Sequence, residues 1–197
     1  KAIMTTDTFP KLETRQLSSG IRITGVAKGA GMIEPDMATM LAYMVTDASI
    51  SPEDMQRLVH SIADRTFNRV SVDSDTSTSD TFVGMANGAS EVTVIFSEET
   101  RKAYEELPDP FAPGALENLP GTDDPSREFI AAAGELCRKL AMDIARDGEG
   151  ATKLITLRVT GARSRSQALL VGRSVINSPL VKTAVYGADP NWGRLVM

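Results

Sequence analysis

The chain has 197 residues, of which 42% are hydrophobic and 24% are charged, the balance of an ordinary soluble globular protein. Its formal net charge of −5, without a conspicuous Lys/Arg cluster, argues against nucleic acid or a membrane as the main partner and leaves open a local basic pocket. The single cysteine, Cys137, cannot form an internal disulfide, and no apolar run approaches the roughly 20 residues that a membrane span needs.

The N-terminal part predicts extended structure followed by a glycine-rich loop. Residues 1–27 are expected to be extended with turns, including a β-prone stretch over 21–26. Residues 28–36 combine two glycines with a proline, so they are predicted to form a loop. An apolar run, 37–45, follows it directly.

Three stretches carry the pattern of a helix. Ser51 is a good N-cap and Pro52 suits the first turn, so a helix is predicted over 51–67. An apolar stripe at helical spacing predicts a second helix from 129 to its end near 148. A shorter helix is predicted over 164–176.

The remaining segments favour strands and one long connection. Residues 70–85 predict a strand, a polar loop and a second strand or buried segment that ends at Asn87-Gly88, and 92–96 predict another strand. Strands are also predicted over 153–160, where apolar and polar residues alternate, and over 180–186. The stretch 97–125 is rich in proline, glycine and acids, which is typical of a linker or a surface insertion. This mixture indicates α/β or α+β layering.

Six segments in chain order together resemble one family, the bifunctional ornithine acetyltransferases/glutamate N-acetyltransferases of arginine biosynthesis. Each segment alone is a weak signal, but they span nearly the whole chain: Ala2-Ile3-Met4-Thr5-Thr6-Asp7-Thr8, Lys28-Gly29-Ala30-Gly31-Met32, Met37-Ala38-Thr39-Met40-Leu41, Asp73-Ser74-Asp75-Thr76-Ser77-Thr78-Ser79-Asp80-Thr81, Asp147-Gly148-Glu149-Gly150 and Asp189-Pro190-Asn191-Trp192-Gly193-Arg194. The resemblance implies an α/β fold in which two β-sheets form a layered sandwich between helices.

The resemblance also implies a reaction. The family's precursors cleave themselves before a threonine, and the matching bond here is Ala38–Thr39. The threonine then takes acetyl from N-acetylornithine and passes it to glutamate in a ping-pong mechanism, and some members also use acetyl-CoA as donor. No cofactor is implied beyond acetyl-CoA as an optional co-substrate.

The residues can support this chemistry. Cleavage would free the α-amine of Thr39, whose ordinary pKa of about 7.7–8.0 suits a base that takes the hydroxyl proton. No histidine is then required, which fits a sequence whose one histidine, His60, lies within a predicted helix. Without the resemblance, Thr39 would be one more residue of a buried apolar run.

Three further residues match substrate-contacting positions of the family. Lys28 is expected to bind the carboxylate of the substrate amino acid, and Glu149 the ammonium of ornithine. Thr5 is expected to contact substrate as well. Their ordinary alternatives are a solvated loop lysine, an acid beside a helix end and a turn threonine.

The acidic run 73–80 invites comparison with a calcium loop. Thr78 stands where the turn glycine should be, and Gly84 stands where the bidentate glutamate should be. We therefore expect no metal and predict that this hydrogen-bonded loop buttresses the site.

The first residue is Lys1, so we expect residues 1–197 to be a fragment of the central catalytic part of a longer precursor, lacking the family's oxyanion hole and C-terminal substrate contacts. The other cleaved chain of the precursor is an expected partner, with such pairs forming homo-oligomers in the cytoplasm, or in the mitochondrial matrix of a eukaryote. Two alternatives stay open: a related self-processing aminopeptidase that uses water as acceptor, and a non-catalytic binding protein.

Overall fold

A four-stranded sheet is the base of the fold in the computed structural model, which describes residues 2–33, 40–75 and 80–196. The strands β1 (Lys11–Gln16), β2 (Arg22–Lys28), β3 (Leu41–Thr46) and β5 (Thr81–Ala86) lie in that order across it. The pairs β1–β2 and β2–β3 are antiparallel, whereas β3–β5 is parallel because a helical crossover connects them. Two short strands, β4 (Ser49–Ile50) and β6 (Thr93–Val94), pair in parallel beside it.

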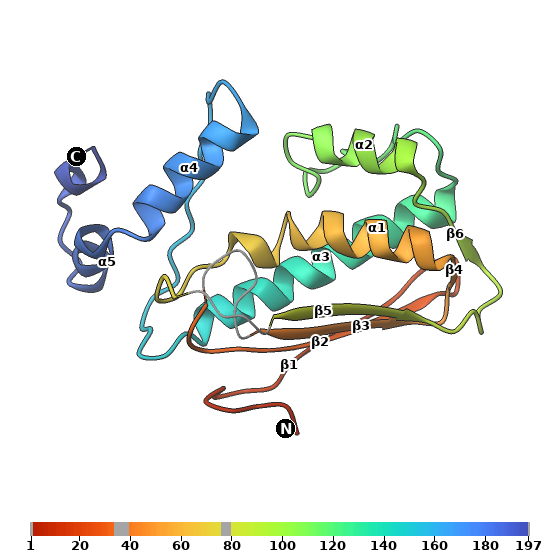
Figure 1. Ribbon diagram of the computed structural model, residues 1–197, viewed down its shortest axis with the longest axis horizontal. Coiled ribbons are helices and arrows are strands. Elements are labelled where there is room, and N and C mark those ends of the chain that lie inside the picture. The colour runs from red at the N-terminus through yellow and green to blue at the C-terminus, as the bar shows by residue number, and fades with distance from the viewer. Residues whose placement is uncertain (1, 34–39, 76–79, 197) are drawn as a thin grey trace.

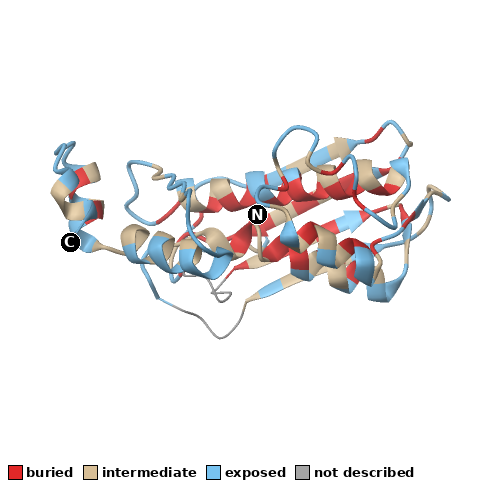
Figure 2. Cartoon of the chain, turned by 90° about the horizontal axis from the view of Figure 1, so that it is seen from above, coloured by how far each residue is buried: buried red, intermediate tan, exposed pale blue. Residues whose placement is uncertain are grey.

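Two helices, α1 (Pro52–Ala63) and α3 (Asp124–Arg146), cover one face of this sheet (Figure 1). Helix α1 begins as predicted, because the side chain of Ser51 accepts from the Asp54 N–H. Helix α3 begins before the predicted residue 129, at a cap where the side chain of Asp123 accepts from the Ser126 N–H. The apolar stripe of α3 is buried against β1 and β2. Figure 2 shows the buried residues of the domain in red, seen from above. The resulting mixed α/β domain confirms the broad fold class expected from the sequence.

Two glycines let these helices approach the sheet. A Cβ on Gly25 of β2 would lie 2.3 Å from Leu136 Cδ2 of α3, and a Cβ on Gly84 of β5 would lie 2.4 Å from Met55 Sδ of α1. Both distances are far below van der Waals contact, so a larger residue at either position would push a helix outward.

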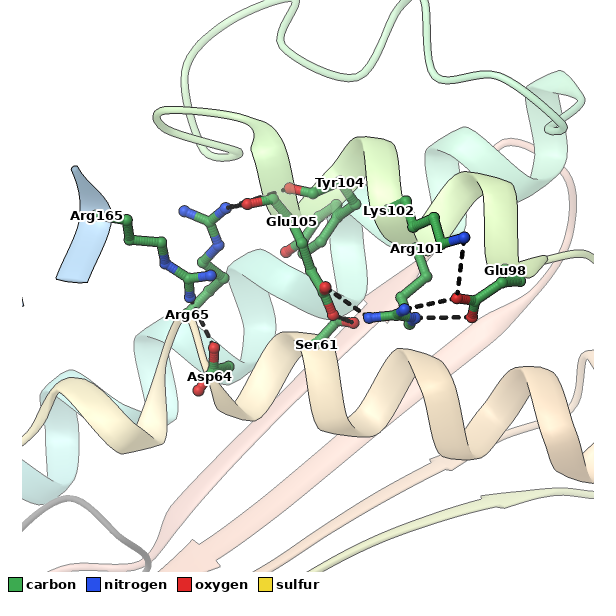
Figure 3. A network of polar contacts seen from close by, with 9 residues as sticks. All are labelled: Ser61, Asp64, Arg65, Glu98, Arg101, Lys102, Tyr104, Glu105 and Arg165. Atoms are coloured by element: carbon green, nitrogen blue, oxygen red, sulfur yellow. Dashed lines mark hydrogen bonds and ion pairs between the residues drawn. The ribbon is translucent and has the colours of Figure 1, made fainter.

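The stretch 97–125 contains a helix that the sequence analysis did not predict, α2 (Glu98–Glu106). Figure 3 shows how α2 is held to α1: Ser61 Oγ donates to Glu105 Oε1 at 3.1 Å, and Arg65 donates to the carbonyls at the end of α2. Tyr104 is buried as well. This stretch is therefore packed onto the domain.

The last 47 residues differ most from prediction. The helix over 164–176 is confirmed as α4 (Arg165–Ile176), but 180–186 belongs to a helix, α5 (Pro179–Tyr186), and 153–160 is no strand. Ser178 caps α5 and Pro179 occupies its first turn, which outweighs the β-branched composition. No described strand pairs with residues 153–160, so the alternation of apolar and polar residues there is not part of a sheet.

Shorter differences occur elsewhere. Of the two strands predicted over 70–85, only the second forms, as β5. The first part is irregular chain that follows a 3₁₀ turn, η1 (Phe67–Arg69). A second 3₁₀ turn, η2 (Trp192–Leu195), lies near the end of the chain. Among the described residues, no helix combines the length and apolar character needed to cross a membrane.

The second face of the sheet is apolar and open. The register aligns Leu12, Val26, Tyr43 and Val83 in one row across the four strands. A neighbouring row contains Val45, which is 39% exposed, and Met85, which is 46% exposed. We call this surface the open sheet face.

Candidate active site

Lys28 is the last residue of β2, and its charge has no partner among the residues that the structure describes. The residue is 8% exposed, yet no hydrogen bond or ion pair joins its ammonium to another described residue. It pairs in register with Leu41, two positions after Thr39. An ammonium that no described residue neutralises is available to bind an anion such as a carboxylate.

The chain turns directly after Lys28. Gly29 has φ of 149°, and a Cβ there would lie 3.1 Å from Ile33 and 3.9 Å from the Cα of Met40. Glycine is needed here for both the dihedral angle and the close approach. The glycine loop therefore lies against the residue that follows Thr39.

A buried ion-pair network lies beside this loop, on the helix-covered face of the sheet. Lys11 Nζ is 2.6 Å from Asp7 Oδ1 and 2.6 Å from Asp147 Oδ2, and all three side chains are at most 2% exposed. Asp7 Oδ1 also accepts from the Gly29 N–H at 2.8 Å. Asp147 accepts from both the N–H and the hydroxyl of Thr8.

Burial alone would raise the pKa of both carboxyl groups. At Asp7 the hydrogen bonds from Gly29, Lys11 and Thr5 outweigh burial, so the pKa is lowered. At Asp147 the bonds from Lys11 and Thr8 do the same. Both groups are therefore held in their ionised form.

Glu149 lies two residues after Asp147 in the sequence and contacts the glycine loop. Its N–H donates to the Ala30 carbonyl at 2.7 Å. Its carboxylate lies against Gly31, where an added Cβ would be 2.9 Å from Glu149 Cδ and 3.1 Å from each oxygen. The carboxylate is exposed and forms no ion pair with another described residue, so it is free to bind a cation.

Thr5 is exposed at the N-terminal edge of the same region, and its N–H donates to Asp7 Oδ2 at 3.2 Å. Between the N-terminal segment and the 146–151 turn lies a cleft of about 370 Å³, lined by Thr6, Thr8 and Glu149 among others. The structure thus brings Thr5, Lys28 and Glu149, which are far apart in sequence, to segments that touch one another.

The acidic run 73–80 supports the site at its two described ends. Asp73 accepts from the N–H groups of Met32 at 2.5 Å and Ile33 at 2.9 Å, and Asp80 Oδ1 accepts from the Met40 N–H at 2.7 Å. These acids hold the residues on either side of 34–39. Ala38 and Thr39, the predicted cleavage site and nucleophile, lie outside the described residues.

Asp80 has one further property. Its Oδ2 is buried without a hydrogen-bond partner among the described residues, and burial raises the pKa of this carboxyl group.

Within the described ranges, no group of three or more His, Cys, Asp or Glu side chains could hold a metal ion.

A second cavity, of about 600 Å³, opens on the other side of Glu149. Arg65, Arg69 and Arg138 line one part of it, together with Lys153 and Lys182. Burial and the neighbouring Arg165 lower the pKa of Arg69 to about 10. This is the local basic pocket that the net charge of −5 left open.

Several of these contributors were missed by the sequence analysis. Asp7 and Asp147 lie inside motifs that carried the resemblance, but their partner Lys11 lies outside them. The available signal for Lys11 was its position at the first residue of a strand, directly after a proline, which does not reveal burial.

Over its whole length the chain is similar to known proteins of one family. The ArgJ family model matches residues 1–197. The chain is 48% identical over 197 residues to glutamate N-acetyltransferase Oat2 of Streptomyces clavuligerus, covering 100% of this chain and 42% of that protein. It is 47% identical over 200 residues to the arginine biosynthesis bifunctional protein ArgJ of Rhizobium meliloti, covering 100% of this chain and 44% of that protein.

A solved structure is similar as well. The arginine biosynthesis bifunctional protein argJ of Bacillus halodurans superposes with a TM-score of 0.62 at 39% identity, over 78% of this chain and 61% of that chain. The present chain spans less than half the length of the two curated relatives.

Proposed function

Because the chain belongs to the ArgJ family, we propose that it is the central catalytic part of an acetyltransferase that moves acetyl from N-acetylornithine to glutamate. The full-length protein would cleave itself at Ala38–Thr39 and use Thr39 as nucleophile. Acetyl-CoA is an optional second donor, for which the basic pocket beside Glu149 offers cations.

The acetyl transfer proceeds in two balanced steps. The Thr39 hydroxyl attacks the acetyl carbonyl, the bond to the ornithine nitrogen breaks, and the freed α-amine of Thr39 moves the hydroxyl proton to that nitrogen. The amine of glutamate then attacks the ester carbonyl, the C–O bond breaks, and the hydroxyl regains its proton.

The observation that carries this proposal is the ammonium of Lys28, a residue only 8% exposed, which no other described residue neutralises. Donor and acceptor are both amino acids with an α-carboxylate, which would supply the missing anion in each half-reaction. Lys28 lies on the strand beside Leu41, so this carboxylate would bind close to the segment that bears Thr39.

The carboxylate of Glu149 supports ornithine as the donor's amino-acid part. It is free of ion pairs among the described residues and lies across the glycine loop from β2. Ornithine carries a δ-ammonium at the far end of its side chain, and Glu149 is placed to neutralise it. Thr5, at the edge of the same region, would contact the substrate from the N-terminal segment.

We further propose that the open sheet face packs against a second sheet in the full-length protein. Leu12, at 61% exposed, and Val45 and Met85 leave an apolar surface that a soluble monomer rarely exposes. A second sheet there would complete the layered sandwich between helices. The pairing of β2 with β3 would hold the two chains separated at Ala38–Thr39 in one unit, and such units can form homo-oligomers.

The first test is intact mass spectrometry of the full-length protein incubated with N-acetylornithine, with Thr39→Ala alongside. We expect two chains separated at Ala38–Thr39 in the wild type, with one acetyl group on the chain that begins at Thr39. Thr39→Ala should stay uncleaved and unacetylated. A wild type that behaves like the variant would remove Thr39 from this role.

Two companion measurements separate the neighbouring hypotheses. Acetate released at the same rate with and without glutamate would replace the transferase by a hydrolase. Lys28→Met should raise KM for N-acetylornithine by about 10-fold or more, because a charged hydrogen bond to the carboxylate is lost. Lys102→Met, on the exposed outer side of α2, is its matched control.

A further inference from the structure

Lys11 is the most deeply buried lysine described in the structure, and the proposed reaction does not use it. Its side chain is 0% exposed, so it cannot touch a substrate that enters from solvent. Its ammonium is bound on two sides, by Asp7 and Asp147, at 2.6 Å each. Asp7 lies four residues before it in the sequence, whereas Asp147 lies at the end of α3.

The carboxylates of Asp7 and Asp147 could not both stay ionised this close together without the ammonium of Lys11 between them. Each accepting oxygen lies 2.6 Å from the same nitrogen, so the two oxygens are separated by no more than twice that distance. At this range, in a buried site, two unneutralised carboxylates repel strongly and one of them takes up a proton.

Each carboxylate also fixes backbone that leads to a proposed substrate contact. Asp7 accepts from the Thr5 N–H and from the N–H of Gly29, the neighbour of Lys28. Asp147 accepts from Thr8 and begins the turn that carries Glu149. The backbone positions of Thr5, Lys28 and Glu149 are thereby set by contacts that meet at one ammonium, that of Lys11.

We propose that Lys11 is a positioning residue for the acyl donor. It acts through Asp7 and Asp147 to hold the three substrate-contacting segments in one geometry. The roles of Thr5, Lys28 and Glu149 in this inference rest on the proposed function. The geometric part, one ammonium that joins three segments, does not.

The test uses the full-length protein with Lys11→Met, which keeps the length of the side chain and removes the charge, and Lys11→Arg, which keeps the charge. The control is Lys139→Met on α3, which removes an exposed pair with Asp143 and Glu13. We expect Lys11→Met to raise KM for N-acetylornithine at least about 10-fold at pH 8 with a smaller change in kcat. Lys11→Arg should recover part of the loss, and Lys139→Met should match the wild type.

The pH profile separates positioning from mere structural support. In Lys11→Met the unpaired carboxylates should protonate at a higher pH, which relieves their repulsion. KM of the variant should therefore fall relative to the wild type as the pH is lowered from about 8 to about 5.5. The inference would be overturned by a variant whose melting temperature is lower but whose KM is unchanged, with a ratio of variant to wild-type KM that stays constant across pH.

If Lys11→Met does not fold, Asp147→Asn is the milder variant, since it removes one charge and leaves an oxygen for Thr8. It should raise KM for N-acetylornithine as well, and an unchanged KM would count against the inference. A wild type without acetyl transfer would defeat the proposed function instead. Hydrogen exchange would then decide: the Gly29 and Thr8 amides should exchange at least about 10-fold faster in Lys11→Met, and equal rates would sink the positioning role.

Discussion

The carboxylate of Glu149 can lie where it does because residue 31 has no side chain. An added Cβ at Gly31 would be 2.9 Å from the carboxyl carbon of Glu149. The φ of Gly31 is not positive, so alanine fits the backbone there. The contact is with the far end of a flexible, exposed side chain, which can rotate away at little cost in folding free energy.

We therefore predict that Gly31→Ala raises KM for N-acetylornithine about 10-fold while the unfolding free energy changes by less than about 0.5 kcal/mol. Steady-state kinetics and urea unfolding of the full-length protein measure the two effects. Gly31→Ala combined with Glu149→Ala should be no worse than Glu149→Ala alone. If the two changes multiply instead, residue 31 acts on something other than Glu149.

Asp80 predicts a pH dependence opposite to that of Asp7 and Asp147. Burial raises the pKa of Asp80, so its contribution to stability is present at low pH and is lost as the pH rises through the raised value. The pKa values of Asp7 and Asp147 are lowered, so their contribution is present above about pH 4 and is lost as the pH falls.

Asp80→Asn should therefore gain stability relative to its parent as the pH rises from about 3.5 to 7, because only the parent must ionise a buried carboxyl group. The comparison belongs in a Thr39→Ala background, where no freed α-amine at residue 39 adds a charge beside Met40. Urea unfolding at several pH values measures the difference. A difference that stays constant with pH would mean that Asp80 titrates as an exposed group.

The site could be predicted from sequence only where a residue type itself carries the chemistry. Lys28 and Glu149 were proposed through the motifs that hold them, and the structure brings their segments together. Lys11 could not be found, because what matters is its burial between two acids, one of them 136 positions away. Whether Thr39 is the nucleophile stays a prediction.

At the scale of elements, β2 and α3 depend on the absence of a side chain at Gly25. The built Cβ lies 2.3 Å from Leu136 and 2.8 Å from Leu140, two residues fixed in the core of α3. Gly25→Ala should cost about 1–3 kcal/mol through overpacking, which lowers the melting temperature by several degrees. Calorimetry of the full-length protein measures it.

Gly172→Ala in α4 is the matched control for that prediction. An added Cβ there meets nothing closer than Val159 Cγ2 at 3.8 Å, and alanine is the better helix former. The melting temperature should stay the same or rise slightly. Equal losses at Gly25 and Gly172 would show that backbone freedom, rather than packing against α3, explains the effect.

Elements whose signals are local could be predicted from the sequence. Capping by Ser51 and Ser164 and the apolar stripe of α3 are properties of neighbouring residues, and all three helices form. Residues 153–160 show the limit, because alternation indicates a strand only where a partner strand exists. The parallel pairing of β3 with β5 depends on a crossover that no local pattern reveals.

At the scale of the whole molecule, helices α1 and α3 cover one face of the sheet, and the other face carries apolar side chains that stay partly exposed. The register places Leu12, Val26, Tyr43 and Val83 in a continuous row on that open sheet face. The curated relatives are more than twice as long as this chain, so a family member has ample sequence to cover such a surface.

Val45, at the centre of the open sheet face, allows a direct test by thiol labelling of the full-length protein. Val45→Cys is close in size and lies on a central strand, where it is 39% exposed in the present chain. Cys137 is fully buried, and burial raises the pKa of its thiol, so it should contribute little background. We expect a maleimide to label Val45→Cys at least about 100-fold more slowly than the same protein unfolded in guanidinium, since a packed sheet excludes the reagent. Glu99→Cys, on the exposed side of α2, should react at nearly the unfolded rate. Rapid labelling at residue 45, located by peptide mass mapping, would mean that the face stays open and that the domain is a two-layer rather than a sandwich structure.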